Sequence, residues 1–112
     1  MKLVTAIIRP EKVDDIRSAL EDYGVRGLTV SNASGYGQQR GHTEVYRGAE
    51  YTSDLLRKTR VEVLVPDHSA PDIVDVLVST ANTGRAGDGK VWITQVEGAV
   101  RVRTGERGDA AV

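Results

Sequence analysis

Residues 84–90, GRAGDGK, have the residue types and spacing of a loop that could bind phosphate. They match the G-x-x-x-x-G-K start of the Walker loop, in which glycine amides and a lysine contact phosphate oxygens. The match then fails, because Val91 stands where Ser or Thr would hold magnesium and a predicted strand follows instead of a helix. This pattern alone favours a plain turn after a helix end. Gly87 and Gly89 nevertheless let backbone N–H groups converge on an anion, and Lys90 adds a cation.

A second group of basic residues lies near the C-terminus, in RVRTGER at residues 101–107. In an extended segment Arg101 and Arg103 would project from the same face. Two neighbouring guanidinium groups suit the oxygens of a phosphate. A solvated basic tail explains the segment equally well.

Residues 35–41, GYGQQRG, form a glycine-rich exit from a predicted strand, and a lone G-x-G is weak evidence for a site. The adjacent amides of Gln38 and Gln39 offer neutral donors and acceptors for a polar ligand or a metal-bound oxygen. Lys58 lies beyond the next long segment and could return to the same place, where its ammonium would pair with a carboxylate.

Composition limits the classes of function. A chain of 112 residues, 39% hydrophobic with a net charge of −1, fits one soluble globular domain and lacks the basic excess of a nucleic-acid-binding protein. The absence of cysteine excludes disulfides and thiolate metal sites, and His42 and His68 are not spaced as metal ligands. No apolar run approaches the ~18–20 residues that span a bilayer, and the N-terminal start is too short for a signal peptide. We therefore expect a cytoplasmic protein without membrane insertion.

The elements that must position these residues follow from hydrophobic periodicity. Strands are predicted over residues 2–8, 25–37, 59–65 and 90–96, and helices over residues 11–24 and 69–84. Gly24 is a stop signal for the first helix and Gly84 for the second. Ser69 and Asp72 have the spacing of a capping box at the start of the second helix.

This order predicts an α+β, ferredoxin-like β-α-β-β-α-β sandwich with a long loop between strands two and three. Both faces of the first strand are apolar, through Leu3 and Ile7 on one side and Val4 and Ile8 on the other. Two helices cover only one face of a four-stranded sheet. We therefore expect the bare face to pack against other copies in an obligate homo-oligomer.

The long segment, residues 37–57, shows neither a helical stripe nor a clean strand alternation. Loops longer than ~12–15 residues without structure of their own are usually functional or disordered. One interpretation is a mobile insertion. Tyr46 and Tyr51 favour the other, a surface that contacts a partner.

The stretches YRGAEY (46–51) and TGRAGDGKVWI (83–93), together with GHTEVYRGAEY and VRVRTGERG, resemble the PII nitrogen-regulatory signal proteins. The similarity runs from Met1 to about Gly108. It implies one domain over residues 1–112, a homotrimer whose sheets line the interior, and three functional segments. These are a partner-docking T-loop at about 37–57, a B-loop at about 82–90 and a C-terminal segment at about 98–112.

The resemblance also implies that ATP or ADP binds between neighbouring subunits. Gly87, Asp88, Gly89 and Lys90 match the family residues at the phosphates, and Arg101 and Arg103 match those arriving from the adjacent chain. The region around the base and sugar is matched by Thr29, Gly35, Gly37 and Leu64. Gln38 stands where the family usually has an arginine near the phosphates, and Arg57 where it commonly has proline.

Three further matches concern the effector and the modification. Gln39 matches the residue that, with the ATP phosphates, holds a Mg²⁺ chelated by 2-oxoglutarate. Lys58 matches the residue that pairs with the distal carboxylate of 2-oxoglutarate. Tyr51 matches the tyrosine that a nucleotidylyltransferase uridylylates or adenylylates in many bacterial members.

We weigh three classes of function. The first is a signal protein that senses ATP, ADP and 2-oxoglutarate and acts on an ammonium transporter, a glutamine-synthetase-modifying enzyme or another nitrogen regulator. The second is a small nucleotide-dependent enzyme with weak ATPase activity, for which GRAGDGKVW offers only Asp88 as a base. The third is an RNA-binding ferredoxin-like module, which would need exposed aromatics on its central strands in a chain without phenylalanine. The sequence favours the first and no enzymatic role.

Overall fold

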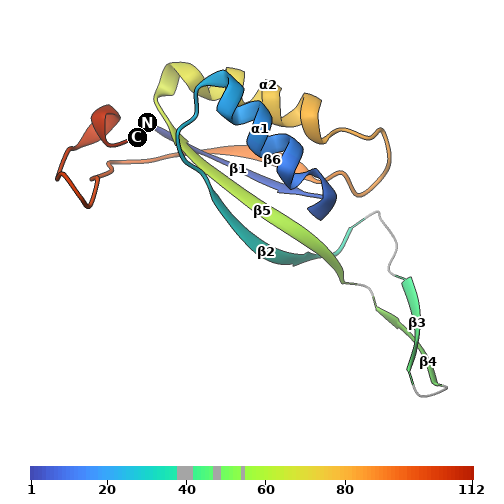
Figure 1. Ribbon diagram of the computed structural model, residues 1–112. Helices are drawn as coiled ribbons and strands as arrows, with labels where there is room; N and C mark the ends of the chain where they lie inside the picture. The colour runs from blue at the N-terminus through green and yellow to red at the C-terminus, as the bar shows by residue number, and fades with distance from the viewer. Residues whose placement is uncertain (38–41, 47–48, 54) are drawn as a thin grey trace.

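The computed structural model describes the backbone of residues 1–37, 42–46, 49–53 and 55–112, and the side chains of residues 1–37 and 55–112. Its main sheet has the strand order β2-β5-β1-β6, formed by β1 (Lys2–Ile8), β2 (Thr29–Gly35), β5 (Leu56–Val65) and β6 (Lys90–Gln95). Every neighbouring pair is antiparallel. The helices α1 (Val13–Tyr23) and α2 (Ala70–Ala81) lie side by side on one face of this sheet (Figure 1). The predicted ferredoxin-like fold is confirmed.

The core lies between the helices and the sheet. Alternation along β1 turns Val4, Ala6 and Ile8 toward the helices, opposite Val63 and Val61 of β5. The helical spacing of three and four residues places four more side chains in the same layer. These are Ile16 and Leu20 of α1 with Ile73 and Leu77 of α2, each at most 1% exposed.

The predicted signals for the helix ends are confirmed in part. Gly24 ends α1 with φ 114°, a left-handed conformation that favours glycine. The capping box is wrong: Ser69 makes no side-chain cap, because a 3-10 turn (Asp67–Ser69) leads straight into α2 and keeps Ser69 helical. Helix α2 also ends earlier than Gly84, since the backbone turns extended at Asn82.

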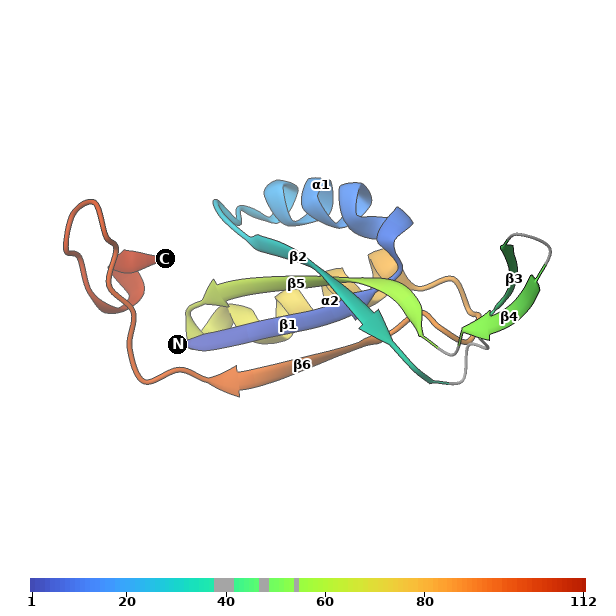
Figure 2. The same ribbon diagram turned by 90° about the horizontal axis from the view of Figure 1, so that it is seen from below.

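The long segment between β2 and β5 contains a two-stranded antiparallel hairpin, β3 (His42–Tyr46) and β4 (Ala49–Ser53). Figures 1 and 2 show this hairpin projecting beyond the end of the main sheet. The expectation that this segment has no regular structure is therefore wrong. The hairpin's ladder comes from backbone pairing alone, so its strands need not show the apolar alternation that marks a strand over a core.

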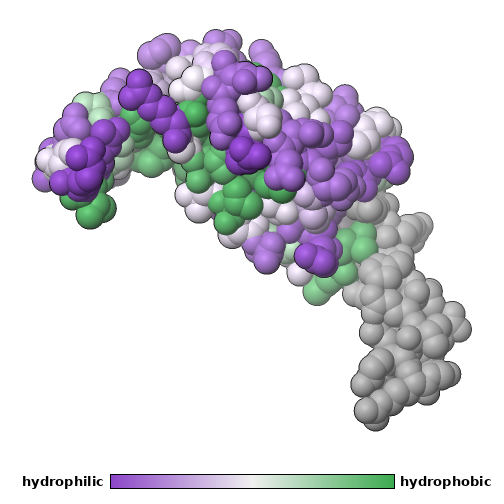
Figure 3. Space-filling model, in the orientation of Figure 1, coloured by the Kyte–Doolittle hydropathy of each residue, from purple (hydrophilic) through white to green (hydrophobic). Residues whose placement is uncertain are grey.

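The face of the sheet that the helices leave uncovered carries apolar side chains. Leu3 of β1 pairs with Leu64 of β5, and Trp92 of β6 lies opposite Thr5. Leu64 and Trp92 remain 40% and 39% exposed. Apolar atoms gather along the concave underside of the subunit in Figure 3. This is the bare face that the sequence predicts, and it leaves apolar surface for another protein surface to cover.

The C-terminal segment leaves β6 at the end of the sheet opposite the hairpin (Figures 1 and 2). It finishes in a 3-10 helix (Gly108–Ala111). Within the described ranges, no helix is both long enough and apolar enough to pass through a membrane.

Candidate functional site

The loop of residues 83–90 joins α2 to β6 and lies against the end of β1. Gly87 and Gly89 have φ values of 99° and 95°, which L side chains rarely adopt. A Cβ on Gly89 would lie 1.6 Å from the backbone oxygen of Ile7. The sequence therefore needs glycine at position 89 for the 83–90 loop to lie this close to the sheet.

Asp88 holds the 83–90 loop together from within. Its carboxylate accepts hydrogen bonds from the backbone N–H groups of Thr83 (2.7 Å) and Gly84 (3.0 Å) and from the Thr83 hydroxyl. The Arg9 Nε donates to the same carboxylate at 2.9 Å. The hydroxyl and N–H of Thr83, together with Arg9, hold the pKa of Asp88 far below its ordinary value. Asp88 is thus a fixed anion that organises a turn, and it is poorly suited to accept a proton.

Lys58 of β5 contacts the 83–90 loop. Its Nζ donates to the backbone oxygen of Gly87 at 2.7 Å. Burial, reinforced by the nearby Arg9 cation, lowers the pKa of Lys58, while Glu11 and Asp88 act in the other direction. The predicted carboxylate partner of Lys58 would therefore meet a cation that already contacts the loop.

A cavity of about 710 Å³, the Lys90 cavity, opens where β2, β5 and the 83–90 loop meet. It brings together six residues predicted for the site: Gly35, Gly37, Lys58, Gly87, Gly89 and Lys90. Three of its other lining residues, Tyr36, Arg60 and Trp92, were not predicted. The Arg60 guanidinium lies 6.0 Å from the centre of the Trp92 ring. The cavity thus combines cations, glycine backbone and aromatic surface.

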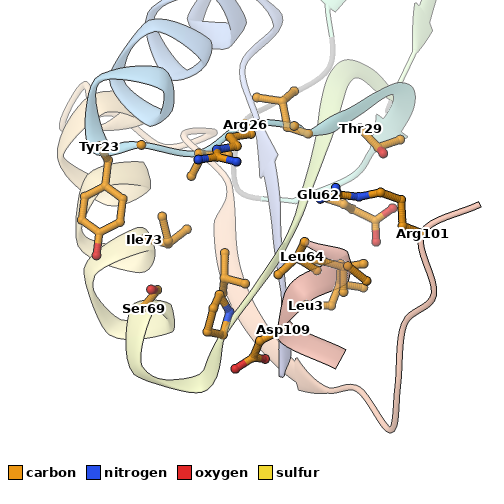
Figure 4. A pocket seen from close by; sticks show the side chains of 18 residues that line it. Leu3, Tyr23, Arg26, Thr29, Glu62, Leu64, Ser69, Ile73, Arg101 and Asp109 are labelled. Atoms are coloured by element: carbon orange, nitrogen blue, oxygen red, sulfur yellow. The ribbon is translucent and has the colours of Figure 1, made fainter. Parts of the chain in front are cut away.

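A second cavity of about 700 Å³, the Arg101 cavity, is lined by other predicted residues (Figure 4). Thr29 of β2 and Leu64 of β5 lie there with Arg101 and Glu62. In Figure 4 the Arg101 side chain extends from the C-terminal segment toward Glu62. The predicted nucleotide-site residues that line a cavity therefore divide between two separate cavities of one chain.

The C-terminal loop, residues 99–108, is a closed turn and not the extended segment expected from RVRTGER. The Arg101 N–H donates to the Glu106 backbone oxygen and the Gly105 N–H to the Arg101 oxygen, both at 2.8 Å. Gly105 permits this closure with φ 74°. Arg101 Nη1 lies 3.3 Å from Glu106 Oε1. Arg103 is exposed and lines neither cavity.

Three predicted residues lie wholly or partly outside the described part of the structure. Gln38 and Gln39 lie outside the described residues. The backbone of Tyr51 pairs with Glu44 across the hairpin, but its side chain lies outside the described part. Among residues 1–37, 42–46, 49–53 and 55–112, no group of three His, Cys, Asp or Glu side chains is placed to hold a metal ion.

Comparison with known proteins shows the family of the chain. Residues 1–106 match the family model described as "Nitrogen regulatory protein P-II". The chain is 49% identical to "Nitrogen regulatory protein P-II 1" of Escherichia coli (strain K12), over 100% of both chains. It is 48% identical to the "Nitrogen regulatory protein P-II" of Klebsiella oxytoca and 46% identical to that of Haemophilus influenzae, again over the full length of each.

Proposed function

Because the chain belongs to the P-II family of nitrogen regulatory proteins, we propose that it is a cytoplasmic, homotrimeric signal protein that binds ATP or ADP between its subunits. In this proposal it reports nitrogen, carbon and energy status to enzymes, transporters or regulators of nitrogen assimilation. The relatives carry names of regulatory proteins, and we propose no catalytic role for this chain.

One observation carries the proposal: the predicted nucleotide-site residues that line a cavity divide between two cavities with different linings. The Lys90 cavity holds cations and glycine backbone suited to phosphates, and the Arg101 cavity holds Thr29, Leu64 and a guanidinium. A heterologous interface that closes a ring places a different surface of each subunit against its neighbour. Such an interface would set the Lys90 cavity of one subunit against the Arg101 cavity of the next. The uncovered apolar sheet face supports the same ring.

The residues present fit a nucleotide polyphosphate. Gly87 and Gly89 keep the loop free of side chains that would block an approach to its backbone, and Lys90 supplies a positive charge. Arg101 and Arg103 would come from the neighbouring subunit, and Thr29 and Leu64 would contact the base and sugar. ATP brings one more phosphate charge than ADP, and Gln38 offers no cation to meet it. We therefore expect ATP and ADP to bind with more similar affinities than when an arginine stands at position 38.

2-Oxoglutarate would bind beside the nucleotide. Lys58 is positioned for its distal carboxylate, because the lysine lines the Lys90 cavity and is held at the Gly87 carbonyl. We propose that Gln39 takes part in holding Mg²⁺ with the phosphates and 2-oxoglutarate. The ion would bring the negative charges of both ligands together at one place.

The hairpin β3–β4 would carry the signal to partners. It projects from the rim of the Lys90 cavity, since Gly35, Gly37 and Leu56 at its base line that cavity. Ligands at the base could therefore bias its conformation. Candidate partners are an ammonium transporter and a glutamine-synthetase-modifying enzyme. Modification of Tyr51 by a nucleotidylyltransferase would add a phosphodiester charge and a base to the hairpin.

A nucleotide-dependent enzyme is less well supported. It would need a base near the phosphates, and the Asp88 carboxylate is held by four donors at a depressed pKa. No observation on the described residues favours this alternative.

Calorimetric titration with ATP, with ADP, and with 2-oxoglutarate in the presence of ATP and Mg²⁺ tests the proposal. We expect both nucleotides to bind and 2-oxoglutarate to bind only when ATP and Mg²⁺ are present. Absence of nucleotide binding, or 2-oxoglutarate binding without ATP, would contradict it.

A further inference from the structure

We propose that Arg9 is a positioning residue that sets the shape of the 83–90 loop without touching the ligand. The proposal rests on the proposed function, because it assigns a role in phosphate binding. Arg9 follows β1 directly and is only 7% exposed. An arginine this buried needs a specific set of partners.

Both ends of the Arg9 guanidinium contact the 83–90 loop. Nε donates to Asp88 Oδ1 at 2.9 Å, and Nη2 donates to the Ala86 backbone oxygen at 2.7 Å. The planar guanidinium fixes the angle between these two donors. Arg9 therefore holds the loop at two points two residues apart, and it fixes orientation as well as position.

Asp88 extends this hold to the start of the loop. Its carboxylate bonds the N–H groups of Thr83 and Gly84, so one anion ties the first residues of the loop to its last turn. Arg9 supplies the matching positive charge. Without it, a carboxylate that is only 22% exposed would lose its ion-pair partner.

Arg9 contacts the 83–90 loop but does not line the Lys90 cavity. Among the described residues that line the Lys90 cavity, neither Arg9 nor Asp88 is present, whereas Gly87, Gly89 and Lys90 are. Arg9 therefore acts on a phosphate in that cavity without direct contact, through the backbone it holds and through its charge, which also lowers the pKa of Lys58.

The contacts also orient two consecutive peptide groups. Arg9 binds the oxygen of Ala86, and Lys58 binds the oxygen of Gly87. In a trans peptide the C=O and the following N–H point in opposite directions, and the described chain contains no cis peptide. The N–H of Gly87 therefore points away from Arg9. The carbonyl oxygens of Ala86 and Gly87 are thus both bonded to cationic side chains, and they are not directed at a bound anion.

The test separates phosphate affinity from general stability. AMP, ADP and ATP are titrated into the unsubstituted protein, Arg9→Gln, Arg9→Lys and Arg17→Gln by calorimetry, with thermal unfolding measured alongside. Arg17 is an exposed arginine on α1 and serves as the matched control. We expect Arg9→Gln to lower ATP affinity by about tenfold, the scale of one lost charge-assisted contact, with less than about threefold loss for AMP. The ATP affinity of Arg9→Lys should lie between those of the unsubstituted protein and Arg9→Gln. Lysine keeps a charge beside Asp88 but lacks the second donor group that also reaches Ala86.

Two results would overturn the proposal. One is ATP affinity in Arg9→Gln equal to that of Arg17→Gln. The other is an equal loss for AMP and ATP, which indicates a general structural role. If Arg9→Gln does not fold, Arg9→Lys carries the test, and unchanged ATP affinity in that variant overturns the proposal. Failure of the unsubstituted protein to bind ATP would instead contradict the proposed function itself.

Discussion

The 83–90 loop and the 99–108 loop are both candidates for phosphate contacts, but they are held in different ways. The 83–90 loop depends on Arg9, which is 79 residues from Asp88 in sequence, buried, and bonded at two points. The 99–108 loop depends on contacts among its own residues, chiefly Arg101 with Glu106. Both side chains of that ion pair are partly exposed, at 35% and 46%.

Under the proposed function, this difference predicts different roles for the two loops in nucleotide binding. A loop fixed by buried, long-range contacts is already in its binding shape and loses little conformational freedom when a ligand arrives. An exposed ion pair stabilises by only ~0–1 kcal/mol, so the Arg101 side chain can leave Glu106 at small cost. The first suits a fixed cradle, and the second suits a segment that closes over the site of a neighbouring subunit.

The largest effect is expected from Gly89→Ala. A Cβ at this position overlaps the Ile7 backbone oxygen, and φ 95° is strained for alanine. We expect a loss of at least ~3 kcal/mol in the free energy of unfolding, or failure to fold, because backbone must move. Gly98→Ala is the control, since nothing lies within 4 Å of its Cβ. Urea unfolding measures both, and equal stability of the two variants would contradict the fixed-loop account.

The next largest effect concerns the two basic groups. Lys90→Ala and Arg103→Ala should each cost ~1.5–3 kcal/mol in ATP binding free energy, the scale of a lost charge-assisted contact. Lys12→Ala, a substitution outside both cavities, is the control. Calorimetry on all three variants decides the point. If Lys90→Ala and Arg103→Ala both bind ATP as the unsubstituted protein does, neither residue contacts the phosphates and the nucleotide binds elsewhere.

The stability that Asp88 gives the 83–90 loop should depend on pH. The folded pKa of Asp88 is depressed, so its contribution to stability is present above its unfolded pKa of about 4 and is lost as pH falls below that. Asp88→Asn should remove part of the acid loss of stability, whereas Asn at the exposed Asp75 should not. The pKa of Asp67 is also lowered, by a hydrogen bond from the N-terminal amine. Protonation of Asp67 should therefore still reduce stability at acid pH in both variants. Urea unfolding between pH 7 and pH 3 measures it, and parallel curves for Asp88→Asn and the unsubstituted protein would count against the Asp88 role.

The smallest effect is expected in the 99–108 loop. Glu106 is a counter-ion for Arg101 and competes with phosphate for its guanidinium. Glu106→Gln should therefore raise ATP affinity, by about twofold to threefold at low salt, as suits an exposed pair. The exposed Glu97→Gln is the charge-matched control. A tenfold loss of affinity in Glu106→Gln alone would mean that Glu106 is needed to build the loop.

The sequence predicted what depends on local patterns. Alternation along β1 separates Leu3 and Ile7 from Val4 and Ile8 on two apolar faces, and Gly24 marks the end of α1 by its need for a left-handed backbone. Glycine and Lys90 identified the 83–90 loop as a candidate anion site. These signals act over a few residues and are visible in a single chain.

Contacts between distant residues could not be read in the same way. No local pattern marks the role of Arg9, because its partners Asp88 and Ala86 lie 79 and 77 residues away. Thr29 and Gly35 line different cavities because they lie at opposite ends of β2. The one signal for Arg9 is its place directly after an apolar strand, where a charged residue is easily drawn into a buried ion pair.

The central claim is that one nucleotide site combines the Lys90 cavity of one subunit with the Arg101 cavity of its neighbour. Lys90→Ala and the double variant Arg101→Ala/Arg103→Ala are unfolded together in equal amounts and refolded as mixed trimers, and binding is measured at an ATP concentration too low for either variant alone to bind detectably. In a closed ring with random mixing, about a quarter of the interfaces pair two intact halves, so ATP binding should return to about a quarter of the unsubstituted capacity. No recovery in mixed trimers that have demonstrably formed would contradict the claim.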